Sequence, residues 1–209
     1  MRSIPNRRDR QRLEILRSAA ECFRDRGFEA ASMEEIGRGV GMTKGNLYYY
    51  FKSKKEILFF AQRMSLDRLL KVSARIGRLR ANPAQKLHLL AEAHVRCLLA
   101  EMHAAAAHIE FHALPPVQLR RVIGQRDRYE RRVRGMIEEG MREGLFNRGD
   151  SKLATFAVLG ALNWAVRWYR PDGPWGVEDI AKGLARILVR GLLVRSRTYR
   201  EASLGKVMA

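Results

Sequence analysis

The residues between positions 43 and 49 have the side chains and spacing needed to read a nucleic-acid duplex. The outer side of a short helix there is expected to present Thr43, Lys44, Gly45, Asn46, Tyr48 and Tyr49. Lysine donates to guanine acceptors or to phosphate, asparagine matches a base edge, and tyrosine hydroxyls reach phosphate oxygens. Gly45 has no side chain, so the backbone can approach closely. Lys54, at the start of the following helix, adds a cation where helix amides also favour phosphate.

Two capping boxes define the elements that must position these residues. Ser32 with Glu35, and Ser53 with Glu56, match the pattern of an N-cap serine followed by glutamate at N3. They bracket two short helices, expected over 33–40 and 43–50, which follow a first helix over 8–26.

A tight turn containing Gly41 joins the two short helices, which is typical of a helix-turn-helix. Apolar side chains are expected to anchor this motif on the first helix: Ile36, Val40, Leu47 and Phe51. The tyrosines could instead pack a small core. We favour that alternative for Tyr50, and contact with DNA for Tyr48 and Tyr49.

Residues 12–60 resemble the DNA-binding domain of the TetR family of bacterial one-component repressors. The pattern is followed almost throughout Ile36 to Glu56, including Gly41-Met42-Thr43-Lys44-Gly45-Asn46-Leu47-Tyr48-Tyr49-Tyr50-Phe51-Lys52-Ser53-Lys54. The resemblance implies a base-proximal set of Lys44, Gly45, Asn46 and Tyr48, and a phosphate set of Thr43, Tyr49 and Lys54. Asn46 stands where threonine is more usual, and Tyr49 where histidine is more usual, which leaves the base preference open.

The charge of the chain implies an anionic partner. Its 209 residues contain 40 Lys+Arg and 22 Asp+Glu, a formal net charge of +18 with an isoelectric point of about 10.8. Such a balance fits nucleic acid, an acidic membrane surface or a phosphorylated ligand. Residues 1–60 contain 13 basic and 8 acidic residues, whereas 61–209 contain 27 and 14. Most of the excess therefore lies outside the helix-turn-helix.

Helical periodicity along almost the whole chain predicts an all-α fold of about nine helices. Prolines and glycines separate the later helices, which are expected over 55–80, 84–102, 103–113, 116–145, 151–170 and 177–197. We place a boundary inside the long fourth helix. Residues 1–60 are then the DNA-binding domain, and residues 61–209 a ligand-binding and dimerisation domain.

The last two helices have the pattern of a dimerisation pair. One has a stripe of small residues, Ala157, Gly160 and Ala161, and the other has a long face containing Ile180, Leu184, Ile187, Leu188 and Gly191. Packed against the same pair of a partner they would form a four-helix bundle. A core within one subunit is the alternative. The TetR resemblance favours a homodimer on a palindromic operator.

Arg126 falls near the centre of the apolar face of the 116–145 helix. A charge there must be paired or meet a ligand. One interpretation is an ion pair with Glu130, and the other is a pocket in which Arg126 meets an anionic group. The neighbouring arginines could form a solvated face or a phosphate-attracting surface at the mouth of such a pocket.

The segment from Asn163 to Pro174 is similar to one in TetR-family repressors of lipid, fatty-acid and sterol degradation, which sense acyl-CoA thioesters. The similarity implies an acyl-CoA effector, which would account for the basic 61–209 region. Trp164 and Trp168 could then line the acyl pocket, or simply pack between helices. Arg167 is either a cation at the pocket mouth or a surface residue.

The sequence excludes or disfavours several other classes of protein. No apolar run approaches the roughly 20 residues of a membrane span, and the N-terminus has no apolar signal segment. Two cysteines rule out a disulfide framework and fit a reducing cytoplasm. His108 and His112 are weak evidence for a metal, and no catalytic motif is present, so we expect no metal, cofactor or enzymatic activity. A nonspecific nucleic-acid-coating protein is the main alternative, and an enzyme acting on CoA esters is a distant third.

Overall fold

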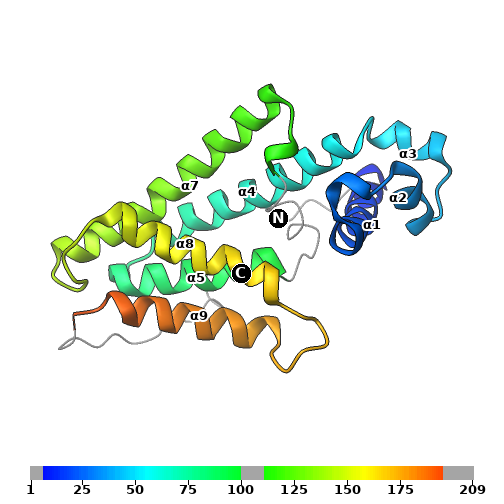
Figure 1. The fold of residues 1–209 in the computed structure, drawn as a ribbon. Helices are drawn as coiled ribbons and strands as arrows, with labels where there is room; N and C mark the ends of the chain where they lie inside the picture. The colour runs from blue at the N-terminus through cyan, green and yellow to red at the C-terminus, as the bar shows by residue number, and fades with distance from the viewer. Residues whose placement is uncertain (1–6, 100–110, 195–209) are drawn as a thin grey trace. The chain divides into compact units, whose positions relative to one another are not determined.

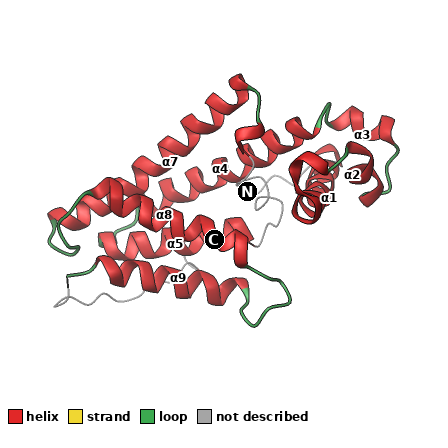
Figure 2. Cartoon of the chain, viewed as in Figure 1, coloured by secondary structure: helices red, strands yellow, loops and turns green. Residues whose placement is uncertain are grey.

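The computed structural model describes residues 7–99 and 111–194. Within these residues the chain is all α-helical and contains no β-strand, which confirms the predicted fold class (Figure 2). The helices are α1 (Arg7–Ala30), α2 (Met33–Gly39), α3 (Lys44–Tyr50), α4 (Lys54–Gly77), α5 (Pro83–Leu99), α7 (Pro116–Arg142), α8 (Ser151–Trp168) and α9 (Val177–Leu192), with a short 3-10 helix at Phe111–Ala113. His108 and most of the helix expected over 103–113 lie outside the described residues. None of the described helices is long and apolar enough to cross a membrane.

The described residues form two compact units, 7–64 with 111–122 and 65–99 with 123–194. In the first unit the Ser32 capping box is confirmed. Ser32 Oγ accepts from the Glu35 N–H at 3.2 Å, and the Glu35 carboxylate accepts from the Ser32 N–H at 3.1 Å. A reciprocal cap of this kind needs only residues three apart, which is why the sequence pattern predicts it well.

The second predicted capping box is only half formed. Ser53 Oγ accepts from the Glu56 N–H at 3.2 Å, as expected. The Glu56 carboxylate, however, accepts from the N–H of Lys52 at 2.6 Å rather than from that of Ser53. The helix start is therefore as predicted, with one of the two hydrogen bonds displaced by one residue.

The first helix bends at Gly27, which has a left-handed φ of 77°. Glycine adopts this conformation without steric cost, so the regular helix ends where the sequence predicts. The chain then turns Phe28 back into the core, where its ring meets the edge of Phe23 at a centroid distance of 5.0 Å. This return brings the backbone carbonyls of 28–31 close to the start of α4.

Helix α5 is the centre of the second unit. It packs against both α8 and α9, and 14 of its 17 residues are buried (Figure 1). A helix that is apolar on nearly all sides suits such a position. The inner face of α9 that meets it contains Ile180, Ala181, Ala185 and Val189.

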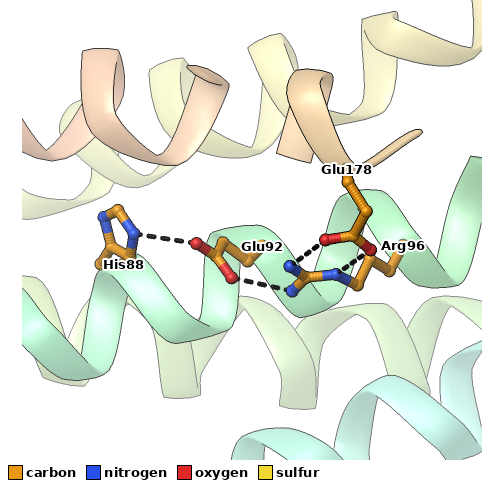
Figure 3. Close-up of polar contacts among 4 residues, drawn as sticks. All are labelled: His88, Glu92, Arg96 and Glu178. Atoms are coloured by element: carbon orange, nitrogen blue, oxygen red, sulfur yellow. Dashed lines mark hydrogen bonds and ion pairs between the residues drawn. The ribbon is translucent and has the colours of Figure 1, made fainter. Parts of the chain in front are cut away.

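Charged residues nevertheless lie on α5 and tie it to α9 (Figure 3). Glu92, which is 4% exposed, accepts from His88 Nε2 at 3.0 Å and from Arg96 Nη1 at 2.8 Å. The Arg96 guanidinium also donates in a fork to both oxygens of Glu178, at 2.7 and 2.6 Å. Burial raises the pKa of Glu92, but the hydrogen bonds from His88 and Arg96 outweigh it, and the net pKa is lowered. The network keeps a buried carboxylate ionised and fixes the start of α9 on α5.

Candidate nucleic-acid interface and regulatory core

Helix α3 presents a polar face to solvent from an anchored position. Leu47 and Phe51 are both 0% exposed and hold the helix on its unit. Lys44, Gly45 and Asn46 are exposed on its first turn. A side chain at position 45 would have no neighbouring atom within 4 Å of its Cβ. The packing of the protein therefore does not require a glycine there. The arrangement leaves these residues available for a major groove.

Thr43 and Tyr49 have neighbours that orient them. Thr43 Oγ1 accepts from the Asn46 N–H at 3.3 Å and caps α3, while its own hydroxyl proton remains a donor. Tyr49 is 64% exposed, and the Arg8 guanidinium lies 5.6 Å from its ring centroid. Tyr48 is half-buried and Tyr49 packs edge-on against Tyr50 at 5.2 Å.

Lys54 is placed differently from the other residues of the predicted phosphate set. Its ammonium donates to the carbonyls of Phe28, Glu29 and Ala31 at 2.8, 2.6 and 3.3 Å. A lysine ammonium has three hydrogens, so these bonds use all of its donors. Lys54 therefore closes the end of α1 against α4.

A buried polar cluster lies inside the second unit. His94 and Tyr129 are 2% and 4% exposed. The Tyr129 hydroxyl donates to His94 Nδ1 at 2.9 Å, and His94 Nε2 donates to Asn163 Oδ1 at 3.1 Å. The cluster thus joins α5, α7 and α8 and satisfies both ring nitrogens of a neutral imidazole.

Arg126 lies next to this cluster, one turn before Tyr129 on α7. Its side chain is half-buried, and burial lowers the pKa of its guanidinium. Burial also lowers the pKa of His94 to about 4, with the positive charge of Arg126 acting in the same direction and the Asn163 hydrogen bond opposing it. A desolvated guanidinium beside a neutral histidine is suited to meeting a carbonyl or an anionic group.

We expect the pH dependence of folding stability to report on His94. An unfolded histidine titrates near pH 6.5, while the native residue stays neutral down to about pH 4. Stability from this residue is complete above pH 6.5 and is lost as pH falls towards 4, by at most about 3 kcal/mol. Urea unfolding between pH 4.5 and 7.5 measures it. His94→Gln, which can donate and accept, should flatten this part of the profile.

The matched control is His112→Gln, the same substitution at an exposed histidine. Identical pH profiles for the parent chain and His94→Gln would contradict the assignment.

The structure separates the four residues predicted to contact an effector. Arg126 is half-buried, whereas Trp164, Arg167 and Trp168 are exposed on α8. Trp164 is 63% exposed, and the Arg167 guanidinium stacks 5.9 Å from its ring centroid. It is the preceding residue, Asn163, that points inwards to His94. The helix orientation therefore places both tryptophans on the outer surface of their subunit.

The outer face of α8 forms a continuous exposed stripe at helical spacing. Its exposed residues are Leu153, Phe156, Ala157, Gly160, Trp164 and Trp168. The sequence prediction included Ala157 and Gly160 but missed Leu153 and Phe156. The spacing of three and four residues between them was the signal that would have found them. Ala161, beside the stripe, is half-buried.

Helix α9 divides its predicted interface residues between two faces. Ile187 is 67% exposed and Gly191 is also exposed, while Leu184 and Leu188 are half-buried. Ile180 is 6% exposed and lies on the α5-facing side of α9.

Among residues 7–99 and 111–194, no group of three His, Cys, Asp or Glu side chains could hold a metal ion.

Two family models match the chain. Residues 15–60 match the model of "Bacterial regulatory proteins, tetR family", and residues 80–192 match "Tetracyclin repressor-like, C-terminal domain". The first match contains α2 and α3, and the second contains the buried polar cluster and both helices of the predicted dimerisation pair.

Individual relatives are similar over most of their length. The transcriptional repressor KstR2 of Mycobacterium tuberculosis is 29% identical over 187 residues, which cover 87% of this chain and 92% of the relative. The crystal structure of the regulator PfmR from Thermus thermophilus has a TM-score of 0.76 and 33% identity, covering 84% of this chain and 97% of that one. AibR in complex with isovaleryl coenzyme A and operator DNA has a TM-score of 0.74 and 26% identity, covering 85% and 98%.

Proposed function

The chain belongs to the TetR family of bacterial transcriptional regulators, and from this premise we propose that its effector is an acyl-CoA thioester. It is a ligand-responsive repressor that binds operator DNA as a homodimer. In the proposed mechanism, effector binding favours a dimer whose recognition helices no longer match the operator spacing. Operator and effector must then weaken each other's binding by the same factor.

The observation that carries the effector proposal is the desolvated Arg126 beside the His94–Tyr129 pair. A thioester carbonyl accepts hydrogen bonds, and a partly desolvated guanidinium is a strong donor to it. AibR, which is similar over 85% of this chain, has been solved with isovaleryl coenzyme A, and that supports the same ligand class here.

For the operator interface, we propose that α3 enters the major groove. Lys44, Gly45, Asn46 and Tyr48 would lie near the bases, and Thr43 and Tyr49 near the phosphates. The exposed first turn and the buried Leu47 support this assignment. Lys54 would act mainly by holding the carbonyl end of α1 in place.

For the dimer interface, we propose the exposed stripe of α8 together with the outer residues of α9. Burying Trp164 and Phe156 against a partner would remove a large apolar surface from water, which single subunits rarely leave exposed. Trp168 and Arg167, at the end of the stripe, would lie at its edge, where they could also reach a ligand.

We also propose a domain boundary, a cellular location and the absence of enzymatic activity. We place the domain boundary near residue 60, inside α4. The protein would act in the cytoplasm, where its operator is. It would have no enzymatic activity, in keeping with the regulatory relatives.

Fluorescence anisotropy on DNA flanking the gene tests the proposal. Near 150 mM salt, we expect saturable binding that survives scrambled competitor and is reversed by an acyl-CoA thioester but not by its free acid. Arg126→Gln should keep operator binding and lose most of the thioester response. Arg142→Gln, an exposed change at the end of the same helix, is the matched control.

Each other outcome is informative. Specific operator binding that no thioester alters would remove the effector proposal and leave the repressor. Equal displacement by scrambled DNA would favour a nonspecific coating protein.

A further inference from the structure

The second unit contains an unusually basic pair of helical segments. Residues 65–80 contain five lysines and arginines and one aspartate, and residues 123–134 contain five arginines and two acidic residues. The first segment is the later part of α4 and its end, and the second is the middle of α7. They supply much of the positive charge that the sequence places outside the helix-turn-helix.

Two contacts show that these segments lie side by side (Figure 1). Gln125 Nε2 donates to Asp67 Oδ1, and Arg132 Nη1 donates to the Leu70 carbonyl and, at 3.1 Å, to Ser73 Oγ. We call the line of contact between α4 and α7, from Asp67 to Ser73 and from Gln125 to Arg132, the α4–α7 seam.

Helical periodicity places further cations along the seam. Lys71 lies one turn after Asp67, and Arg128 lies one turn after Gln125 and one turn before Arg132. Lys71, Arg128 and Arg132 are all exposed. Each of these three side chains therefore reaches solvent beside the seam. The hydrogen bonds of Gln125 and Arg132 hold the two helices together there.

Two of the three acidic groups in these segments contact other side chains, and the third, Asp127, is exposed. Asp67 accepts from Gln125, and Glu130 pairs with Arg134 at 3.4 Å. Among the described residues, neither Lys71 nor Arg128 forms an ion pair. Both hydrogen bonds of Arg132 use Nη1, which leaves the hydrogens on Nε and Nη2 for an outside acceptor.

We infer that the α4–α7 seam binds the nucleotide phosphates of the CoA thioester through Lys71, Arg128 and Arg132. This inference rests on the proposed function. Coenzyme A carries a pyrophosphate and a 3′-phosphate at one end and the acyl group at the other. Arginine forks match phosphate oxygens, and lysine adds a point charge. The seam thus supplies cations for one end of the effector.

Because Arg126 lies on the same stretch of α7, this helix has cations for both the acyl end and the nucleotide end of the thioester. Tyr129 is buried against His94, Arg126 is half-buried, and Arg128 faces solvent. A helix with its side chains is about 10–12 Å across, which an extended pantetheine arm can span. One turn of α7 can therefore meet the thioester on its inner side and the phosphates on its outer side.

The test compares acyl-CoA with the matching acyl-pantetheine, which has the same acyl end but no nucleotide. The probe is the straight-chain acyl-CoA that binds most tightly in a panel from acetyl to oleoyl, measured by calorimetry on the full chain at two salt concentrations. We expect Lys71→Gln/Arg128→Gln to weaken acyl-CoA binding about tenfold or more, with a smaller salt dependence. Acyl-pantetheine affinities of parent and variant should agree within about twofold.

Two controls separate local from general effects. Arg142→Gln/Lys152→Gln removes two exposed charges elsewhere in the second unit and should bind acyl-CoA like the parent. Lys71→Arg/Arg128→Lys keeps the charges and should restore most of the affinity. Thermal melts of all variants check that the fold is retained.

The remaining outcomes overturn the inference in distinguishable ways. Equal acyl-CoA affinity in parent and double variant would show that the seam does not bind the phosphates, and would leave the proposed function unaffected. No thioester binding by the parent would remove both. Loss of operator affinity by the double variant, with thioester binding retained, would assign the seam to DNA instead.

Discussion

Trp164→Arg should convert the protein from a dimer to a monomer and lower its operator affinity by about 100-fold or more. Trp164 is 63% exposed in the middle of the α8 stripe, so in a dimer the substitution would bury an unpaired charge. Each protomer would then bind a half-site alone and lose the effective concentration that a dimer provides, which is worth about 10²–10⁴. Analytical ultracentrifugation and anisotropy on the same preparation measure both effects.

Trp175→Arg is the matched control for this prediction. Trp175 is 62% exposed, as Trp164 is, but it lies in the loop after α8 and not on the stripe. It should leave the dimer intact. A Trp164→Arg protein that sediments as a dimer would place the interface elsewhere, and a monomer that keeps full operator affinity would contradict the two-fold mode of binding.

Asn46→Asp should abolish most operator binding without lowering stability. The two side chains have the same shape, but a carboxylate only accepts hydrogen bonds and repels phosphate. Operator affinity is expected to fall by about 100-fold. At the third position of α3, after the Thr43 cap, a negative charge meets the positive end of the helix and should add about 0.3–1 kcal/mol of stability. Anisotropy and thermal unfolding give the two readouts.

The control for Asn46→Asp must change the net charge by the same amount. Arg142→Gln does so at an exposed position on α7 and should reduce operator affinity only slightly, through long-range electrostatics. If both variants lose affinity equally, the effect is one of overall charge. If Asn46→Asp binds normally, the first turn of α3 does not approach the bases.

Three features of the first unit were predictable from sequence because they depend on residues close together in the chain. The Ser32–Glu35 cap and the end of the regular first helix near residue 26 involve neighbours only, and the structure confirms both. The burial of Leu47 and Phe51 follows from the period of a short amphipathic helix. The Lys54 contacts could not be predicted, since they join it to carbonyls more than 20 residues away.

The second unit shows where sequence periodicity stops being informative. Helix α5 is apolar on almost every side, so its pattern cannot say which neighbour each side meets. His94 is buried on this helix, but its partners Tyr129 and Asn163 lie 35 and 69 positions away. Only the assembled helices bring these three groups together.

The amino-acid sequence by itself determined the helical class and the polar face of α3, because local hydrogen bonds and helical period specify them. Its motif from Ile36 to Glu56 carried the resemblance to the family. The tertiary structure decided how α8 is rotated about its axis. That rotation turns Asn163 towards His94 and Trp164 to the surface, although the two are adjacent in the chain. The physical reason is that a helix with apolar residues on several sides does not by itself specify which side faces the core. Its orientation follows from the packing and hydrogen bonds available on every neighbouring helix at once.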